Sequence, residues 1–398
     1  MNAEKFSSLG NTPNARLKRI RAMTEGLGYA GLGLWLAAER AGDSPEQTRL
    51  FYEKHATLHA AAGVRYWKVD WGRHERDMMY RRILTETAHR VAPGLFVEHC
   101  VTQIPLVQDR YEENFFDTRR RLAADLLTFS DAYRIYDLCP PFEDVDTFAR
   151  LDDAFSVAKC APHAEGRGLV SAEGSDYIGV TLGCTLQIAA GSESEKIALR
   201  FHRLSPPFGV REAEYRRSTE TLTDSLYFAR NVKHWIATEW SVVSMTAPAV
   251  MARGCELPTV TPVAGERPFV TASRHPHTGV YAVGSFRRTI DPNRRISYPA
   301  DVTLAVEGRC VTLGVFGVFH TLTLKYPHPL PKRITVLAQD MRCDYSIDMT
   351  TRVHISEDLL HFDGRDLRDM AEFSMFCSEF SEPALLLRIT ACDPEPRV

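Results

Sequence analysis

The feature that most constrains this fold is a repeated alternation of short apolar segments with amphipathic ones over the first two-thirds of the chain. Strand candidates end near residues 36, 70, 98, 137, 172 and 190, and helical segments separate them. A (β/α)8 barrel of about 250 residues uses roughly 31 residues per β/α unit, which fits most of these spacings. The spacing therefore predicts an α/β fold of the (β/α)8-barrel type, incomplete, with six visible β/α units.

The pattern changes near residue 258. Short alternating segments separated by Gly, Pro and Asp turns replace the helical periodicity, which predicts a C-terminal antiparallel β-sandwich. A chain of 398 residues has room for two domains. We predict a barrel domain over residues 1–257, including a helical stretch over 193–244, and a sandwich domain over 258–398.

The composition excludes several classes of protein. The formal net charge is −3, from 48 basic and 51 acidic residues. The chain therefore lacks the excess of basic residues that would indicate nucleic-acid binding. The apolar runs are shorter than the roughly 20 residues of a membrane-spanning helix, and the N-terminal residues do not resemble a secretory leader. Nine cysteines without a C-x-x-C pair indicate reduced thiols. We expect a cytoplasmic protein without metal or cofactor.

Two motifs are set aside. Residues 26–31 match G-x-G-x-x-G, but they follow a helix and lead into a strand, whereas a dinucleotide fingerprint follows a strand and opens a helix. We interpret them as a helix stop. His275 and His277 lack a third ligand at a suitable spacing, so we expect a solvated turn there.

Polar side chains end successive predicted strands, where a barrel places its active site. Lys68 and Asp70 alternate on one strand and so face the same side, and the cation favours the ionised carboxylate that a nucleophile needs. Carboxylates flanked by aromatic rings are typical of sugar sites. The candidates are Lys68, Asp70 and Trp71 on one strand end, Glu98 and His99 on the next, and Arg134 and Asp137 on a third, with Asp131 as an alternative to Asp137.

The segment Tyr66-Trp-Lys-Val-Asp-Trp-Gly72 resembles the Lys-x-Asp nucleophile strand of the α-galactosidase clan, glycoside hydrolase families 27 and 36. The order of the later strand ends and the C-terminal β domain are similar too. This resemblance implies a retaining hydrolase of α-galactoside-like substrates that needs no metal. By analogy Asp70 is the nucleophile, Asp137 the general acid/base, and Trp35, Lys68 and Arg134 contact the sugar. The first two barrel strands of the clan have no counterpart before Leu17.

Two alternatives stay open beside the hydrolase. The missing strands are compatible with a non-catalytic sugar-binding protein of the same fold. A lyase or aldolase with Lys68 as Schiff-base nucleophile is the other, although Asp70 on the same face keeps that lysine protonated. Because an incomplete barrel exposes strand edges, we also expect a homo-oligomer or a piece of a longer chain, with carbohydrate as the only other partner.

Overall fold

The computed structural model describes residues 4–39, 42, 44–70, 72–101, 115–135, 144–160, 168–172, 177–186, 193–230, 239–291, 294–331, 333–371 and 383–392. Backbone contacts divide the chain into two compact units. The first comprises residues 1–136 and 160–170, and the second comprises residues 137–159 and 171–398. The predicted domain boundary at 257/258 stays a prediction.

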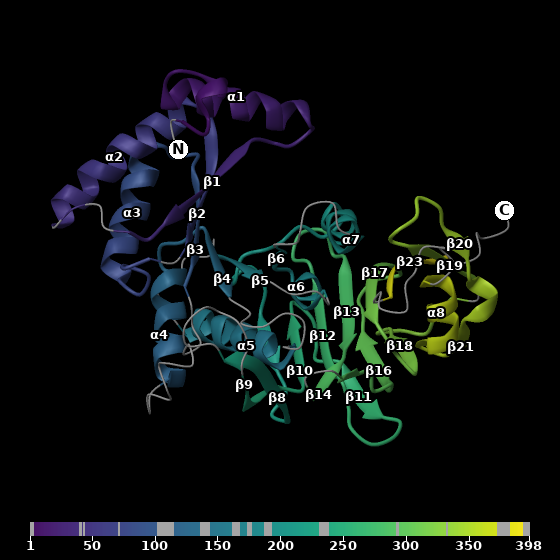
Figure 1. Ribbon diagram of the computed structural model, residues 1–398. Coiled ribbons are helices and arrows are strands. Elements are labelled where there is room, and N and C mark those ends of the chain that lie inside the picture. Colours follow the sequence, from purple (N-terminus) through teal and green to yellow (C-terminus); the bar gives the residue numbers. More distant parts are fainter. Residues whose placement is uncertain are drawn as a thin grey trace. The chain divides into compact units, whose positions relative to one another are not determined.

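The α/β part is built on one sheet whose strands are ordered as in the sequence, from β1 to β6 (Figure 1). The described pairings β1–β2, β2–β3, β3–β4 and β5–β6 are all parallel. This arrangement confirms the prediction of an incomplete barrel-type α/β fold with six strands. The strands are β1 (Leu32–Ala37), β2 (Val64–Asp70), β3 (Phe96–Cys100), β4 (Ala132–Ile135), β5 (Leu169–Ala172) and β6 (Thr185–Leu186).

The helices alternate with these strands, and local sequence explains their ends. Ser44 caps α2 by accepting a hydrogen bond from the Gln47 amide at 3.2 Å, and Pro45 occupies the first helical position. Asp77 caps α3 in the same way, from the Tyr80 amide at 3.0 Å. The helices are α1 (Pro13–Gly26), α2 (Pro45–Ala61), α3 (Met78–Val91), α4 (Phe115–Leu127), α5 (Asp144–Cys160), α6 (Ile178–Thr181) and α7 (Glu193–His202), preceded by the 3-10 turn η1 (Ser7–Leu9).

The core of the first unit lies between the sheet and helices α2 and α3. Trp67 and Val69 of β2 are fully buried there, together with Tyr52 of α2 and Leu84 of α3. The alternate residues of β2 face the other side of the sheet. Trp67 is therefore a core residue, and the residues on either side of it in β2 face away from this core.

The rest of the chain is β-rich, and it begins earlier than predicted. The stretch 193–244 is helical only in α7. It continues as β7 (Tyr215–Arg217) and the antiparallel pair β8 (Thr221–Arg230) and β9 (Glu239–Pro248), so the helical prediction for the segment after residue 202 is wrong. The sequences of β8 and β9 include several Thr and Val residues, whose β-branched side chains favour extended backbone.

The C-terminal β domain consists mainly of two sheets, with strand orders β20-β19-β23-β17-β13-β12-β10-β7 and β11-β16-β18-β22-β21. Most of its pairings are antiparallel, as predicted, but β10–β12, β13–β17 and β16–β18 are parallel, so the sheets are mixed. The elements are β10 (Val250–Arg253), β11 (Thr259–Pro262), β12 (Phe269–Arg274), β13 (Tyr281–Phe286), β14 (Arg288–Asp291), β15 (Arg294–Ile296), β16 (Ala300–Ala305), β17 (Cys310–Gly317), β18 (Thr321–Lys325), β19 (Arg333–Asp340), β20 (Ile347–Asp348), the 3-10 turn η2 (Thr350–Arg352), β21 (His354–Ser356), β22 (Leu359–Asp363), α8 (Gly364–Ala371) and β23 (Ala384–Cys392).

One core of the second unit joins helices α6 and α7 to this β domain. Ile197 and Phe201 of α7 are buried in one cluster with Ala282 of β13 and Phe316 of β17. The rings of Phe201 and Phe316 meet edge-to-face with centroids 5.4 Å apart. Residues on both sides of position 257 therefore share an apolar core. Among the described residues, no helix is long and apolar enough to cross a membrane.

Candidate active site

The pairing of β1 to β4 brings polar side chains of the first unit onto one face of the sheet. Trp35 lies opposite Lys68, and Lys68 lies opposite Glu98. Asp70 follows Lys68 by two residues. Glu98 pairs with Ala132 of β4, and Arg134 follows Ala132 by two residues. Because side chains alternate along a strand, these five share one face near the carboxyl ends of the strands. The sequence-predicted residues Trp35, Lys68, Asp70, Glu98 and Arg134 are thus brought together.

Asp70 is held by two donors that converge on one carboxylate oxygen. The Trp35 indole N–H donates to Asp70 Oδ2 at 2.7 Å, and Lys68 Nζ lies 3.1 Å from the same atom. Asp70 is only 4% exposed, whereas Trp35 remains 51% exposed. A buried carboxylate with an ammonium and an indole donor is stabilised as an anion and restrained in orientation.

Glu98 forms a second cluster beside the first. Its carboxylate accepts hydrogen bonds from the Arg134 guanidinium and the Tyr66 hydroxyl, and from Cys100 Sγ at 3.4 Å. Glu98 and Arg134 are both almost fully buried, so each neutralises the other's charge. Burial and the Glu98 charge raise the pKa of Tyr66, which keeps its hydroxyl protonated as a donor. The Tyr66 ring stacks on Phe96 with centroids 5.4 Å apart.

Tyr66 was not among the sequence candidates, although its position could have revealed it. Residues 66, 68 and 70 have the two-residue period of a strand, so Tyr66 belongs to the same face as Lys68 and Asp70. Glu98 interacts mainly with protein groups, and its contacts organise Arg134 and Tyr66.

His99 lies on the opposite face from Glu98 and is completely buried. Its ring contacts Arg81 and Thr85 of α3 and packs edge-to-face on Phe129. The expectation that His99 contacts substrate beside Glu98 is corrected accordingly, because neighbouring residues of a strand point to opposite faces. Burial and the nearby Arg81 charge lower the pKa of His99, so its ring is neutral.

Asp131 is placed at the wrong end of its strand to replace Asp137. It precedes β4, at the amino end, and its Oδ2 accepts hydrogen bonds from the Val97 amide at 2.8 Å and pairs with His89 Nε2 at 2.7 Å. The interpretation of Asp131 as an alternative acid/base is corrected by this position. Asp137 and Trp71 lie outside the described residues.

The two motifs set aside have structural roles. Residues 26–31 end α1 and lead into β1, which confirms the helix stop. His275 stands in a turn after β12, where its Nδ1 accepts hydrogen bonds from the amides of His277 and Thr278 at 3.1 and 3.0 Å. This imidazole is buried and not solvated as expected, because it packs against Phe208. The described residues contain no cluster of three or more metal-ligating side chains.

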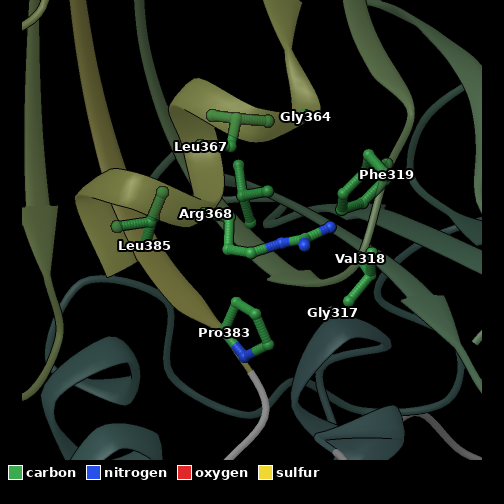
Figure 2. Close-up of a pocket in the computed structure, with 9 residues that line it drawn as sticks. Gly317, Val318, Phe319, Gly364, Leu367, Arg368, Pro383 and Leu385 are labelled. Atoms are coloured by element: carbon green, nitrogen blue, oxygen red, sulfur yellow. The ribbon is translucent and has the colours of Figure 1, made fainter. Parts of the chain in front are cut away.

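A separate pocket lies in the C-terminal β domain between α8 and the neighbouring strands (Figure 2). It encloses about 270 Å³, including open space at its mouth. Apart from Arg368, which reaches across it, the side chains that line it are apolar. It offers no carboxylate, thiol or imidazole for catalysis. Its lining comprises Val315, Gly317, Val318, Phe319, Gly364, Leu367, Arg368, Pro383 and Leu385.

Comparison with known proteins gave similarities at the level of structure. No protein-family model matches the sequence, and no curated protein matches it. The structure is similar to the GH27 β-L-arabinopyranosidase of Geobacillus stearothermophilus, with a TM-score of 0.42 and 9% identity over 100% of this chain and 81% of that chain. It is also similar to a glucosidase from Croceicoccus marinus, with a TM-score of 0.35 and 10% identity over 96% and 83%.

Proposed function

We propose that the chain is a retaining glycoside hydrolase that acts on α-galactoside-like substrates, with Asp70 as nucleophile and Asp137 as general acid/base. The observation that carries the proposal is the pair of donors on Asp70, Lys68 at 3.1 Å and Trp35 at 2.7 Å, at the carboxyl end of a parallel strand. Both donors favour the ionised carboxylate that attacks an anomeric carbon.

The proposed reaction has two steps. In the first, the Asp70 carboxylate forms an ester with the anomeric carbon while Asp137 donates its proton to the departing glycosidic oxygen. In the second, Asp137 removes a proton from water, which attacks the same carbon and releases Asp70. Lys68 and Trp35 hold the carboxylate in place during both steps. The half-exposed Trp35 ring offers an apolar surface on which one face of a pyranose can stack. Arg134, held by its ion pair with Glu98, is the residue proposed to donate its N–H groups to sugar hydroxyls.

The contact between Lys68 and Asp70 favours this reaction over a Schiff-base mechanism. A Schiff-base mechanism needs an amine that is free to attack a carbonyl, whereas Lys68 Nζ lies 3.1 Å from Asp70 Oδ2 and is engaged in that ion pair. Lys68 is therefore assigned to orienting Asp70 and the substrate.

The test is hydrolysis of an aryl α-galactoside with a good leaving group. Asp70→Ala is expected to abolish turnover, and azide is expected to restore it by replacing the nucleophile. Asp137→Ala is expected to spare this substrate but not a poorly activated one, which requires protonation. Asp131→Asn is the matched control and should retain turnover. A retaining enzyme also places the two carboxyl groups about 5–5.5 Å apart.

Each outcome assigns the protein to one class. Loss of turnover in Asp70→Ala with azide rescue supports the hydrolase. If the unaltered protein binds galactose in calorimetry but shows no turnover, the hydrolase proposal is refuted and the protein is a non-catalytic sugar-binding protein. An inverted product, seen by NMR of the released sugar, would refute Asp70 as a nucleophile.

A further inference from the structure

Arg81 of α3 is a fully buried cation that reaches the ends of two strands. Its Nη2 donates to the main-chain carbonyls of Asp70 and Cys100, each at 2.9 Å. Its Nη1 donates to the Val69 carbonyl at 3.1 Å, and its Nε donates to the Glu75 carbonyl at 2.7 Å. One guanidinium therefore joins the last residues of β2 and β3 to the connection that follows β2.

The imidazole of His99 completes this arrangement. Arg81 Nη1 lies 2.9 Å from His99 Nδ1, and arginine only donates, so Nδ1 accepts and the ring proton resides on Nε2. His99 Nε2 then donates to Thr85 Oγ1 at 2.7 Å, and the Thr85 hydroxyl donates to the Arg81 carbonyl at 2.9 Å. The three side chains form a closed circuit in which every donor has an acceptor.

This circuit lies on the helix-facing side of the sheet, opposite the Asp70 carboxylate. Among the described residues, Arg81 makes no ion pair with an acidic side chain, and its hydrogen-bond partners are carbonyls and a neutral imidazole. The main-chain position of Asp70 is thus tied through Arg81 to both Cys100 on the neighbouring strand and helix α3. A lysine has one ammonium in place of the planar fork and cannot reach all these acceptors at once.

We propose that Arg81 is a positioning residue for the nucleophile: by binding the carbonyls of Asp70 and Cys100, it sets where the Asp70 carboxylate stands. This inference rests on the proposed function of Asp70. A positioning role differs from a purely structural one, because it predicts that substitution of Arg81 slows bond formation at Asp70 without weakening the binding of the sugar.

The test uses the full chain and a galactose-configured epoxide that alkylates the nucleophile. The Asp70 carboxylate opens the epoxide to form an ester, and the epoxide oxygen takes up a proton. Mass spectrometry locates the ester, and the dependence of inactivation on epoxide concentration separates binding from the bond-forming rate. In Arg81→Lys we expect the rate constant of inactivation to fall about tenfold or more. The epoxide concentration that gives half of the maximal inactivation rate should stay within about threefold of its original value.

Arg16→Lys is the matched control. Arg16 is also buried and donates to a main-chain carbonyl, that of Gly10, at 2.7 Å, but it belongs to α1. This variant is expected to lose thermal stability without a change in the inactivation rate constant. An unchanged rate constant in Arg81→Lys would overturn the inference, and so would an equal fall in Arg16→Lys.

A second variant covers the case in which Arg81→Lys does not fold. His99→Phe keeps an aromatic ring against Phe129 but removes the Nδ1 acceptor, and we expect a smaller fall in the rate constant. If His99→Phe reacts like the unaltered protein, the inference is overturned. Failure of the proposed function has a different signature: the unaltered protein then forms no ester at Asp70, and the role of Arg81 is refuted with it.

Discussion

Replacing Arg134 by methionine tests whether the buried charges beside Asp70 depend on each other. The side chains of Arg134 and Glu98 are 3% and 4% exposed. The substitution leaves Glu98 charged and buried, and among the described residues it keeps the Tyr66 hydroxyl and the Cys100 thiol as hydrogen-bond donors. Removing one member of such a pair destabilises a protein by about 3–5 kcal/mol. At about 2–4 °C per kcal/mol, the first unit should melt about 6–20 °C lower.

The assay must report on the first unit alone, because a chain with two units does not unfold in one step. Amide hydrogen exchange along β3 and β4 gives the free energy of local opening. The double variant Glu98→Leu/Arg134→Met should recover more than half of the loss, because it removes both buried charges. Arg21→Met breaks the exposed pair Arg21–Glu25 and should lower the free energy by less than about 1 kcal/mol. An equal effect of Arg134→Met and Arg21→Met would refute the reasoning.

Three further predictions follow from the structure. Tyr66→Phe keeps the stack on Phe96 but removes a hydrogen bond to a carboxylate, and it should lower the opening free energy of β3 by about 1.5–3 kcal/mol in the same exchange assay. The hydrogen bond to Asp131 raises the pKa of His89. The stabilisation of the folded protein by this pair is therefore complete below about pH 6.5, and it is lost as the pH rises through the folded-state pKa of His89. When melting curves are compared across pH, a His89→Gln variant should differ most from the unaltered protein in acid. A chain of residues 1–257 should aggregate on expression, since it lacks half of the core around Phe201; a soluble, monomeric fragment on gel filtration would contradict this.

The arrangement of the strand-end side chains could be predicted from the sequence because it depends on local periodicity. Lys68 and Asp70 share a face by the two-residue period of a strand, and parallel strands align their carboxyl ends. The same period also shows why Glu98 and His99 cannot both lie on the face of the sheet that carries Asp70. The opposite directions of these two side chains follow from the strand assignment alone.

Other features depend on contacts that no local pattern reveals. Arg81 stands within an amphipathic helix, where an arginine is ordinarily a surface residue, and only the tertiary structure brings it to the carbonyls of Asp70 and Cys100. The wrong assignment of helix after residue 202 has another cause. Strands β8 and β9 carry polar residues at many positions, so their apolar alternation is weak and gave no clear period.

The apolar core of the first unit determines the geometry of the candidate site. A slip of one residue in the pairing of β2 would turn Lys68 and Asp70 toward the helices and expose Trp67 and Val69. Trp67 is completely buried among Tyr52, His59 and other residues of the core, so such a slip would remove one of the largest apolar side chains from its packing. The cost of exposing Trp67 therefore keeps Asp70 within reach of Trp35. Trp67, on the opposite face of β2 from these polar side chains, thus determines which of them lie close together.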